Sequence, residues 1–541
     1  MSMRICWFAL IAVLLPVATR ADVLVEAPAG KVRGAAIGTL NVFKGIPYAV
    51  PPVGGLRWRP PVATSTWAGV RDATQFGAAC MQPKPRPSIY SDELPAVSED
   101  CLSLNVWTQP GARKQPVFFW IHGGALTSGS SSERMYDGAK LAARGVVVVS
   151  INYRLGVLGY LAHPQLSAES PQRVSGNYGL LDQIEALRWV QRNIAAFGGD
   201  PANVTIAGES AGALSVMYLM ASPQAHGLFT RAIAQSAYMI SMPQLKRAKF
   251  GEQAAEAIGS RLATALGSPN IADLRSMDAA QLTDAASQTG YLPLGTVDGY
   301  VLPRQLVEVF DHGEQAKVPI LAGFNSGEIR SLRFLAPQAP TDAATYEAAI
   351  RKRYVDLAED FLKLYPSSQL EESVLATTRD ALYGWTSERL VAKQTEQGKP
   401  SYLYFFDHGY PTADAAGLHA FHASELPYVF GTADRTPPLW PKVPDAPRET
   451  ELSEAMIGYW TSFATADEPS AANQPSWPAY GTTRAYMLFA ATPRPGTHLL
   501  PGMYELNEQV VCRRRAKGGL SWNWNVGLVA PTLPTREDTC R

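Results

Sequence analysis

The stretch Gly208-Glu209-Ser210-Ala211-Gly212 constrains the fold more than any other part of the chain. It follows a β-branched apolar run at residues 203–207 and precedes an apolar run at 214–220 that suits a helix. A strand that passes into a helix within five residues needs small residues, because the turn is tight and strains its central residue. Such a turn holds its serine above the carboxyl edge of a sheet, at a helix N-terminus that favours negative charge. The stretch therefore predicts an α/β fold that presents Ser210 as a nucleophile.

Other apolar runs extend this pattern along the chain. Residues 116–121, 146–151, 318–323 and 401–406 read as further buried strands, and residues 179–195 have helical spacing. Alternating strands and helices favour a mostly parallel central sheet with helices on both faces. Residues 240–315 and 335–400 are mainly amphipathic and helix-like, so we expect them to form cap insertions. Since no linker divides the chain, residues 22–541 are predicted to form a single domain.

The N-terminus and the cysteines indicate export. Arg4, an apolar run at residues 9–15 and small residues near Ala21 predict a signal peptide over residues 1–21. The apolar run itself is too short to span a bilayer. We therefore expect a periplasmic or extracellular protein. Beyond this segment four cysteines remain, and an even number in an exported chain suggests two disulfides with three possible pairings. The pairs closest in sequence are Cys80 with Cys101 and Cys512 with Cys540.

Charge and composition exclude several classes of function. Lys+Arg and Asp+Glu both number 48, so the chain has no net basic field for nucleic acid. The cysteines are not in CxxC pairs and the histidines form no HExxH pattern, so we expect no metal site, and the substrate is expected to be a small molecule. The C-terminal tail, after about residue 504, has no strong periodicity. Its three consecutive arginines, at residues 513–515, are expected to form a solvated surface turn.

Three more segments carry residues that a nucleophilic serine requires. His122-Gly123-Gly124-Ala125 ends the strand at 116–121, and its backbone N–H groups could stabilise an oxyanion. Glu328 follows the strand at 318–323, where a carboxylate would face the site. The histidine that accepts the serine proton is expected at His422, with His419 and His408 as competitors on spacing alone.

At this point the residues resemble the type B carboxylesterase/cholinesterase-like family. The similar segments span nearly the whole chain after the signal peptide: residues 45–52, 99–106, 152–156, 197–212 and 422–431. The resemblance implies an α/β-hydrolase fold and hydrolysis of carboxylic esters without a cofactor. It selects His422 over His419 and identifies Glu328 as the acid of the triad.

The resemblance also implies roles for residues around the triad. Gly124, Ala125 and Ala211 would supply the oxyanion N–H groups, and Cys80–Cys101 matches the family's first disulfide. Glu209, Ser236 and Glu425 would lie near the catalytic histidine, where carboxylates can stabilise its cation.

The chain departs from the family pattern in ways that bear on the substrate. Ala125 and Leu126 replace a usual glycine and aromatic residue, and Ile329 replaces a common glycine. Arg330 follows, with Arg333 nearby; either both face solvent, or Arg330 binds a substrate carboxylate. Some exported bacterial relatives cleave esters of polycarboxylic acids, including the tricarballylate esters of fumonisins, so such esters are one candidate substrate class. Alternatives are a lipase, thioesterase or amidase with the same triad, or a non-catalytic binding module on the same fold.

Overall fold

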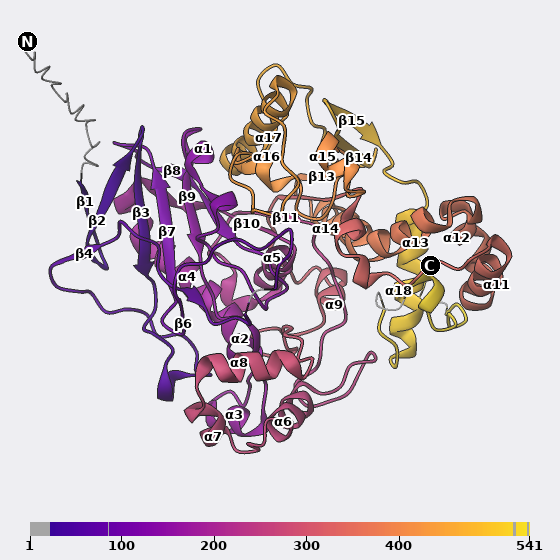
Figure 1. Ribbon diagram of the computed structural model, residues 1–541, viewed down its shortest axis with the longest axis horizontal. Coiled ribbons are helices and arrows are strands. Elements are labelled where there is room, and N and C mark those ends of the chain that lie inside the picture. Colours follow the sequence, from indigo (N-terminus) through magenta and orange to yellow (C-terminus); the bar gives the residue numbers. More distant parts are fainter. Residues whose placement is uncertain (1–21, 85, 523–525, 538–539, 541) are drawn as a thin grey trace, which may run out of the picture.

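The computed structural model describes residues 22–84, 86–522, 526–537 and 540, so the predicted signal peptide lies outside the described residues. The protein is built on one large twisted sheet in the order β1-β2-β3-β7-β9-β8-β10-β11-β12-β13-β14-β15 (Figure 1). Seven consecutive strands of this sheet, β9-β8-β10-β11-β12-β13-β14, run parallel to one another. They are β8 (Gln115–Ile121), β9 (Val147–Ile151), β10 (Gly199–Glu209), β11 (Arg231–Gln235), β12 (Ile320–Asn325), β13 (Ser401–Phe406) and β14 (Ala485–Phe489). The predicted α/β-hydrolase architecture, with a mostly parallel sheet, is therefore confirmed.

Both ends of the sheet are antiparallel, which the apolar runs did not indicate. β1 (Asp22–Ala27), β2 (Gly30–Ile37), β3 (Leu40–Pro47) and β7 (Ser103–Thr108) pair antiparallel with their neighbours at one end, and β15 (Pro493–Thr497) does so at the other. β4 (Val70–Asp72) pairs with β2, and β5 (Ala79–Cys80) with β6 (Val97–Ser98) in a separate small sheet. Most residues of β1 and β15 are partly or fully exposed, so these strands lack the continuous apolar signal of a buried strand.

Helices cover both faces of the sheet, and β8 shows why. Val117, Phe119 and Ile121 pack into one core cluster, while Phe118 and Trp120 pack into a second. Because successive side chains of a strand point to opposite faces, β8 needs an apolar layer on each side. α4 (Tyr178–Asn193), α5 (Ala211–Ala221) and α14 (Trp385–Glu396) contribute to the first layer, and α16 (Leu426–Phe430) and α17 (Pro447–Ala466) to the second.

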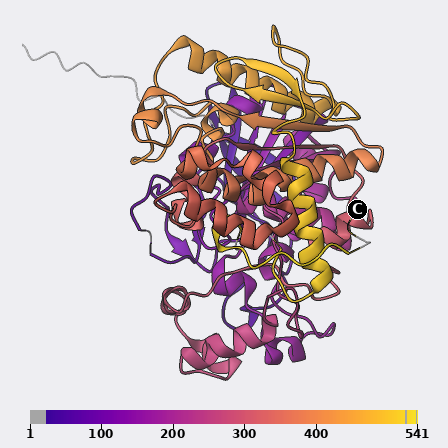
Figure 2. The same cartoon turned by 90° about the vertical axis from the view of Figure 1, so that its right-hand side faces the viewer.

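The two segments predicted as cap insertions are helical. The first contains α6 (Ala255–Ala265), α7 (Ile271–Ser276), α8 (Ala279–Gln288) and α9 (Leu306–Asp311). The second contains α11 (Ala343–Tyr354), α12 (Ala358–Leu364), α13 (Leu370–Arg379) and α14. Figure 1 shows α6–α8 gathered at one end of the molecule and α11–α13 at another, and Figure 2 views the second group from its outer side, with α18 (Met503–Lys517) beside it. That these helices cap the site stays a prediction.

The prediction that residues 513–515 form a solvated turn is wrong. They lie in α18, and each arginine holds a different partner: Arg513 pairs with Asp356, Arg514 donates to the carbonyl oxygen of Trp522, and Arg515 pairs with Asp311. Arg513 and Arg514 are buried, and their hydrogen bonds to Asp356 and to the Trp522 carbonyl oxygen offset the cost of burying a guanidinium.

The remaining cysteines form two disulfides. Cys80 is bonded to Cys101, and Cys512 to Cys540, which selects the pairing of cysteines closest in sequence among the three possible. Within the described residues no helix is long and apolar enough to cross a membrane.

Candidate active site

Ser210 occupies the turn between β10 and α5 in a strained backbone conformation, with φ 56° and ψ −120°. Its N–H donates to the carbonyl oxygen of Gln235 at 2.9 Å, which fixes the turn to β11. The flanking glycines are required by close approaches. A Cβ on Gly208 would lie 2.4 Å from the carbonyl carbon of Gly212, and a Cβ on Gly212 would lie 2.1 Å from the carbonyl oxygen of Ile121. The packing of β8, β10 and α5 around the turn thus dictates these small residues.

The structure brings His422 and Glu328 together beside this turn. His422 Nδ1 lies 2.5 Å from Glu328 Oε2. The other carboxylate oxygen, Oε1, accepts hydrogen bonds from Ser236 Oγ at 2.6 Å and from the Asn325 N–H at 2.8 Å. Both side chains of the pair are buried. The carboxylate is therefore fixed by β12 and by the segment after β11, and it can orient the imidazole through Nδ1.

The competing histidines are paired elsewhere. His419 contacts Asp414 at 2.8 Å and Asp407 at 3.2 Å and is half-buried. His408 is buried against Glu449, at 2.7 Å. His422 is the histidine that the structure places against Glu328.

Glu209, the residue before Ser210, lies beside the other imidazole nitrogen. His422 Nε2 is 3.1 Å from Glu209 Oε1, whereas Ser210 Oγ makes no hydrogen bond to a described residue. Burial raises the pKa of Glu209 to about 8, although the His422 cation lowers it. Burial alone would lower the pKa of His422, but the negative charges of Glu209 and Glu328 raise it to about 9. The site therefore stabilises an imidazolium, the species that a general base becomes in the transition state.

Glu425 lies one layer behind the pair. Asn325 Nδ2 donates to its Oε2 at 2.6 Å and Gln235 Nε2 donates to its Oε1 at 2.9 Å. Burial and the Glu328 charge together raise the pKa of Glu425 to about 6, although the hydrogen bonds from Asn325 and Gln235 lower it. Since Asn325 bonds to Glu425 through its side chain and to Glu328 through its main chain, the two carboxylates share one scaffold.

The backbone after β8 is arranged as an oxyanion hole would require. Gly124 and Ala125 have φ of 95° and 55°, and neither N–H donates a hydrogen bond to a described residue. Ala211 is the first residue of α5, where the N–H has no partner within the helix. A Cβ on Gly123 would lie 3.3 Å from Ser210 Cβ, so this loop passes directly beside the serine.

Two tyrosines beside the imidazole were missed by sequence reasoning. The ring centroids of Tyr90 and Tyr383 lie 6.3 Å and 5.4 Å from that of His422. Tyr90 lies in the loop between Cys80 and Cys101, and Tyr383 lies in a π-helical turn, η8 (Asp380–Gly384). Neither residue belongs to a recognisable motif, although π-helical turns are common at functional sites.

Arg330 is partly exposed and already paired. It lies in α10 (Glu328–Ser331), and its Nη2 donates to both carboxylate oxygens of Glu372 at 2.8 and 2.7 Å. Arg333 pairs with Glu371 through a single hydrogen bond, from Nη2 to Oε1 at 2.8 Å. A substrate carboxylate would therefore have to compete with Glu372 for Arg330.

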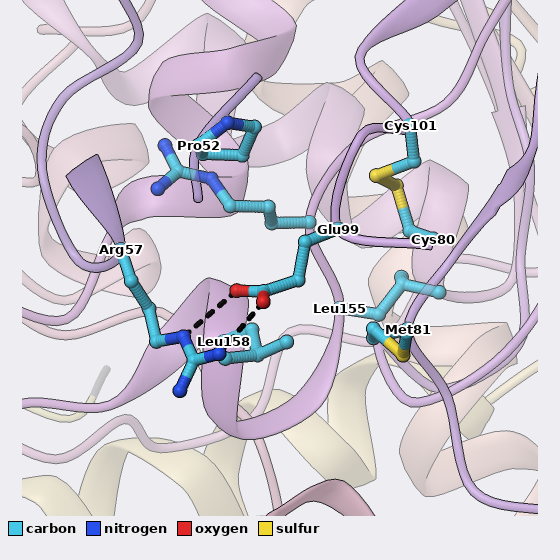
Figure 3. Close-up of a pocket in the computed structure, with 9 residues that line it drawn as sticks. Pro52, Arg57, Cys80, Met81, Glu99, Cys101, Leu155 and Leu158 are labelled. Carbon is cyan, nitrogen blue, oxygen red and sulfur yellow. Dashed lines mark hydrogen bonds and ion pairs between the residues drawn. A yellow bond between two sulfur atoms is a disulfide. The ribbon is translucent and has the colours of Figure 1, made fainter. Parts of the chain in front are cut away.

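A separate pocket lies at the Cys80–Cys101 disulfide (Figure 3). Beside the disulfide, Arg57 forms two hydrogen bonds to Glu99, at 2.8 and 2.7 Å. None of the residues described above for the serine site lines this pocket.

A serine at a strand–turn–helix junction of a mostly parallel sheet, beside a buried Glu–His pair, defines an enzyme of the α/β-hydrolase class. The carboxylesterase family model matches residues 21–503, and the chain belongs to this family. It is accordingly a carboxylic ester hydrolase.

Relatives agree over most of the chain. A fumonisin B1 esterase of Sphingopyxis macrogoltabida is 36% identical over 508 residues, which cover 90% of this chain and 91% of the relative. A para-nitrobenzyl esterase of Bacillus subtilis is 36% identical over 466 residues, covering 83% and 91%. Among solved structures, a PNB esterase matches with a TM-score of 0.77 at 34% identity, covering 89% of this chain and 99% of that one.

Proposed function

We propose that the protein is an exported serine carboxylesterase that works through an acyl-enzyme, with Ser210, Glu328 and His422 as its triad. The observation that carries this proposal is the His422–Glu328 pair beside the strained turn that holds Ser210. The two disulfides support export, as does the predicted signal peptide.

The reaction follows from the groups at the site. Ser210 Oγ attacks the ester carbonyl carbon while His422 Nε2 takes its proton, and the N–H groups of Gly124, Ala125 and Ala211 stabilise the oxyanion. His422 then protonates the leaving alcohol as the C–O bond breaks. Water repeats the attack on the acyl-enzyme with His422 as base, which releases the acid and restores the Ser210 hydroxyl.

The substrate class is the finer part of the proposal. A fumonisin B1 esterase among the relatives supports esters of polycarboxylic acids, such as tricarballylate esters, as one candidate substrate class. A para-nitrobenzyl esterase among the relatives supports para-nitrobenzyl esters as another. We propose that both classes be compared directly; Arg330 would recognise a carboxylate only where the substrate displaces Glu372 from it.

The test is hydrolysis of p-nitrophenyl acetate and butyrate by the purified protein and by Ser210→Ala. We expect turnover in the parent, none above background in the variant, and phosphonate labelling of Ser210 in the parent only. Turnover that survives in Ser210→Ala would contradict the triad. Absence of both turnover and labelling in the disulfide-bonded parent would favour a non-catalytic binding module, whereas rate enhancement at a lipid interface would favour a lipase.

A further inference from the structure

Tyr90 bridges the two elements that carry the acid and the base. Its hydroxyl lies 2.7 Å from Ser331 Oγ and 3.1 Å from the main-chain carbonyl oxygen of His422. Ser331 ends α10, the short helix that begins with Glu328. One phenol hydroxyl thus connects the helix of Glu328 to the backbone of His422.

The ring of Tyr90 also covers the imidazole. It meets the His422 ring edge to face at a centroid distance of 6.3 Å, and it meets Trp440 in the same manner at 5.9 Å. Such aromatic contacts fix ring orientation as well as contributing to packing. The contacts of Tyr90 therefore constrain both the backbone and the ring of His422.

The loop that carries Tyr90 is fixed at three points, so the tyrosine is presented in one place. The Cys80–Cys101 disulfide closes the loop and Glu99 binds Arg57 near its end (Figure 3). Asp92 accepts hydrogen bonds from Arg134 Nη2 at 2.7 Å, Nε at 3.1 Å and N at 3.2 Å, and its side chain is 1% exposed. A pre-organised neighbour is what a catalytic histidine needs to keep its geometry.

We propose that Tyr90 is a positioning residue for His422, holding the base in register with Glu328 and Ser210. The inference rests on the proposed function, because it takes His422 as the general base and acid. Tyr90 exchanges no proton with the substrate; it sets the angle at which His422 Nε2 gives its proton to the leaving alcohol. A misplaced imidazole therefore slows esters with poor leaving groups most, since an alkoxide needs that proton whereas p-nitrophenolate hardly does.

The experiment compares Tyr90→Phe with the parent on ethyl butyrate and p-nitrophenyl butyrate, which share an acyl group. The concentration of active sites is measured by titration with a phosphonate, so that kcat is corrected for any loss of folded enzyme. We expect kcat to fall about tenfold on the ethyl ester and no more than about threefold on the aryl ester, with KM changed less than about twofold. Ser331→Ala, which removes one of the two hydroxyl partners, should give an intermediate loss.

Ser98→Ala is the matched control, because Ser98 lies in the same loop and, among the described residues, its hydroxyl accepts a hydrogen bond only from the Asp100 N–H, at 3.0 Å. It should leave both rates unchanged. A second readout needs no substrate: the low-field proton signal of the His422 Nδ1–H should shift in Tyr90→Phe and stay in Ser98→Ala.

Equal losses on the two esters, or no loss on either with an unchanged proton signal, would overturn the role of Tyr90. Failure of the proposed function looks different, because then Ser210→Ala would match the parent.

Discussion

Glu328 and His422 are separated by 94 positions in the chain and meet with Oε2 2.5 Å from Nδ1. The contact is buried, and the second carboxylate oxygen is fully occupied by Ser236 and Asn325. We therefore expect the free oxygen, Oε2, to hold the imidazole in place and to balance its positive charge.

Glu328→Gln should keep the shape of the site but remove its charge. The Asn325 N–H holds the amide oxygen on its own side, so the amide NH2 faces Nδ1 and favours the wrong tautomer, and we expect kcat on p-nitrophenyl butyrate to fall by about 10³–10⁴-fold. Glu425→Gln is the control, since Glu425 contacts Asn325 and Gln235 rather than His422. A loss in Glu425→Gln as large as in Glu328→Gln would argue against the assignment of the acid.

Glu209→Gln should shift the pH profile. His422 must be neutral to take the serine proton, so kcat/KM rises as pH passes upward through its pKa. That pKa is lowered by burial and raised by Glu209 and Glu328 to about 9. Removing the Glu209 charge therefore moves the acidic limb of the profile to lower pH.

Glu133→Gln is a matched control for this shift. Burial raises the pKa of Glu133 to about 8 as it does for Glu209, but Glu133 makes no contact with His422. The limb should stay in place in this variant. A Glu209→Gln profile that coincides with the parent profile would mean that Glu209 does not set the charge of the imidazole.

Sequence reasoning succeeded where a local pattern carries the geometry. The small residues around Ser210 predict a tight strand–helix turn, and apolar runs such as residues 401–406 predict buried strands. β13 spans that run from Ser401 to Phe406. The antiparallel edge strands were missed because their faces are partly solvated. The arginines of α18 were misread because their partners, such as Asp356, lie far away in the sequence.

The surroundings of His422 show the same limit. Tyr90 reaches the imidazole through a loop whose path depends on a disulfide and on the Asp92–Arg134 pair. The sequence allowed Arg330 to be interpreted as a free carboxylate receptor, because its pairing with Glu372 forms only in the folded protein. Contacts of this kind arise from tertiary structure and leave no pattern in the nearby sequence.

The pairing of Arg330 gives a prediction about substrate charge. Because Glu372 neutralises the guanidinium, Arg330→Ala should change the ratio of rates for a neutral ester and its ω-carboxylate analogue by less than about twofold. Glu372→Ala frees the guanidinium and should raise the relative rate for the anionic ester. Glu371→Ala, which frees Arg333 instead, is the control. A strong loss of anionic preference in Arg330→Ala would show that substrate displaces Glu372.

The two disulfides should differ in what their removal does. Each closes a loop of a few tens of residues, so replacing either pair with serine should lower the free energy of unfolding by roughly 3 kcal/mol. Loss of Cys80–Cys101 should also reduce kcat, since that loop carries Tyr90, whereas loss of Cys512–Cys540 should leave kcat unchanged. Denaturant unfolding and active-site-titrated rates separate the two effects. An unchanged kcat after loss of Cys80–Cys101 would show that the remaining contacts suffice to hold the loop.

Substitutions at Gly124 and Ala125 should have opposite effects on activity, although the two residues are adjacent and both have positive φ. A Cβ on Gly124 would lie 2.1 Å from the carbonyl oxygen of Ser128, so Gly124→Ala must move the backbone and misdirect the neighbouring N–H groups. Because one oxyanion donor is worth about 10²–10³ in kcat, we expect a loss of that order. Ala125→Gly keeps its N–H and relieves the strain of a side chain at φ 55°, so it should retain activity. Steady-state rates on p-nitrophenyl butyrate, with thermal unfolding as the folding control, test both variants. If Gly124→Ala were fully active in a folded protein, the oxyanion would have to be stabilised by groups other than this loop.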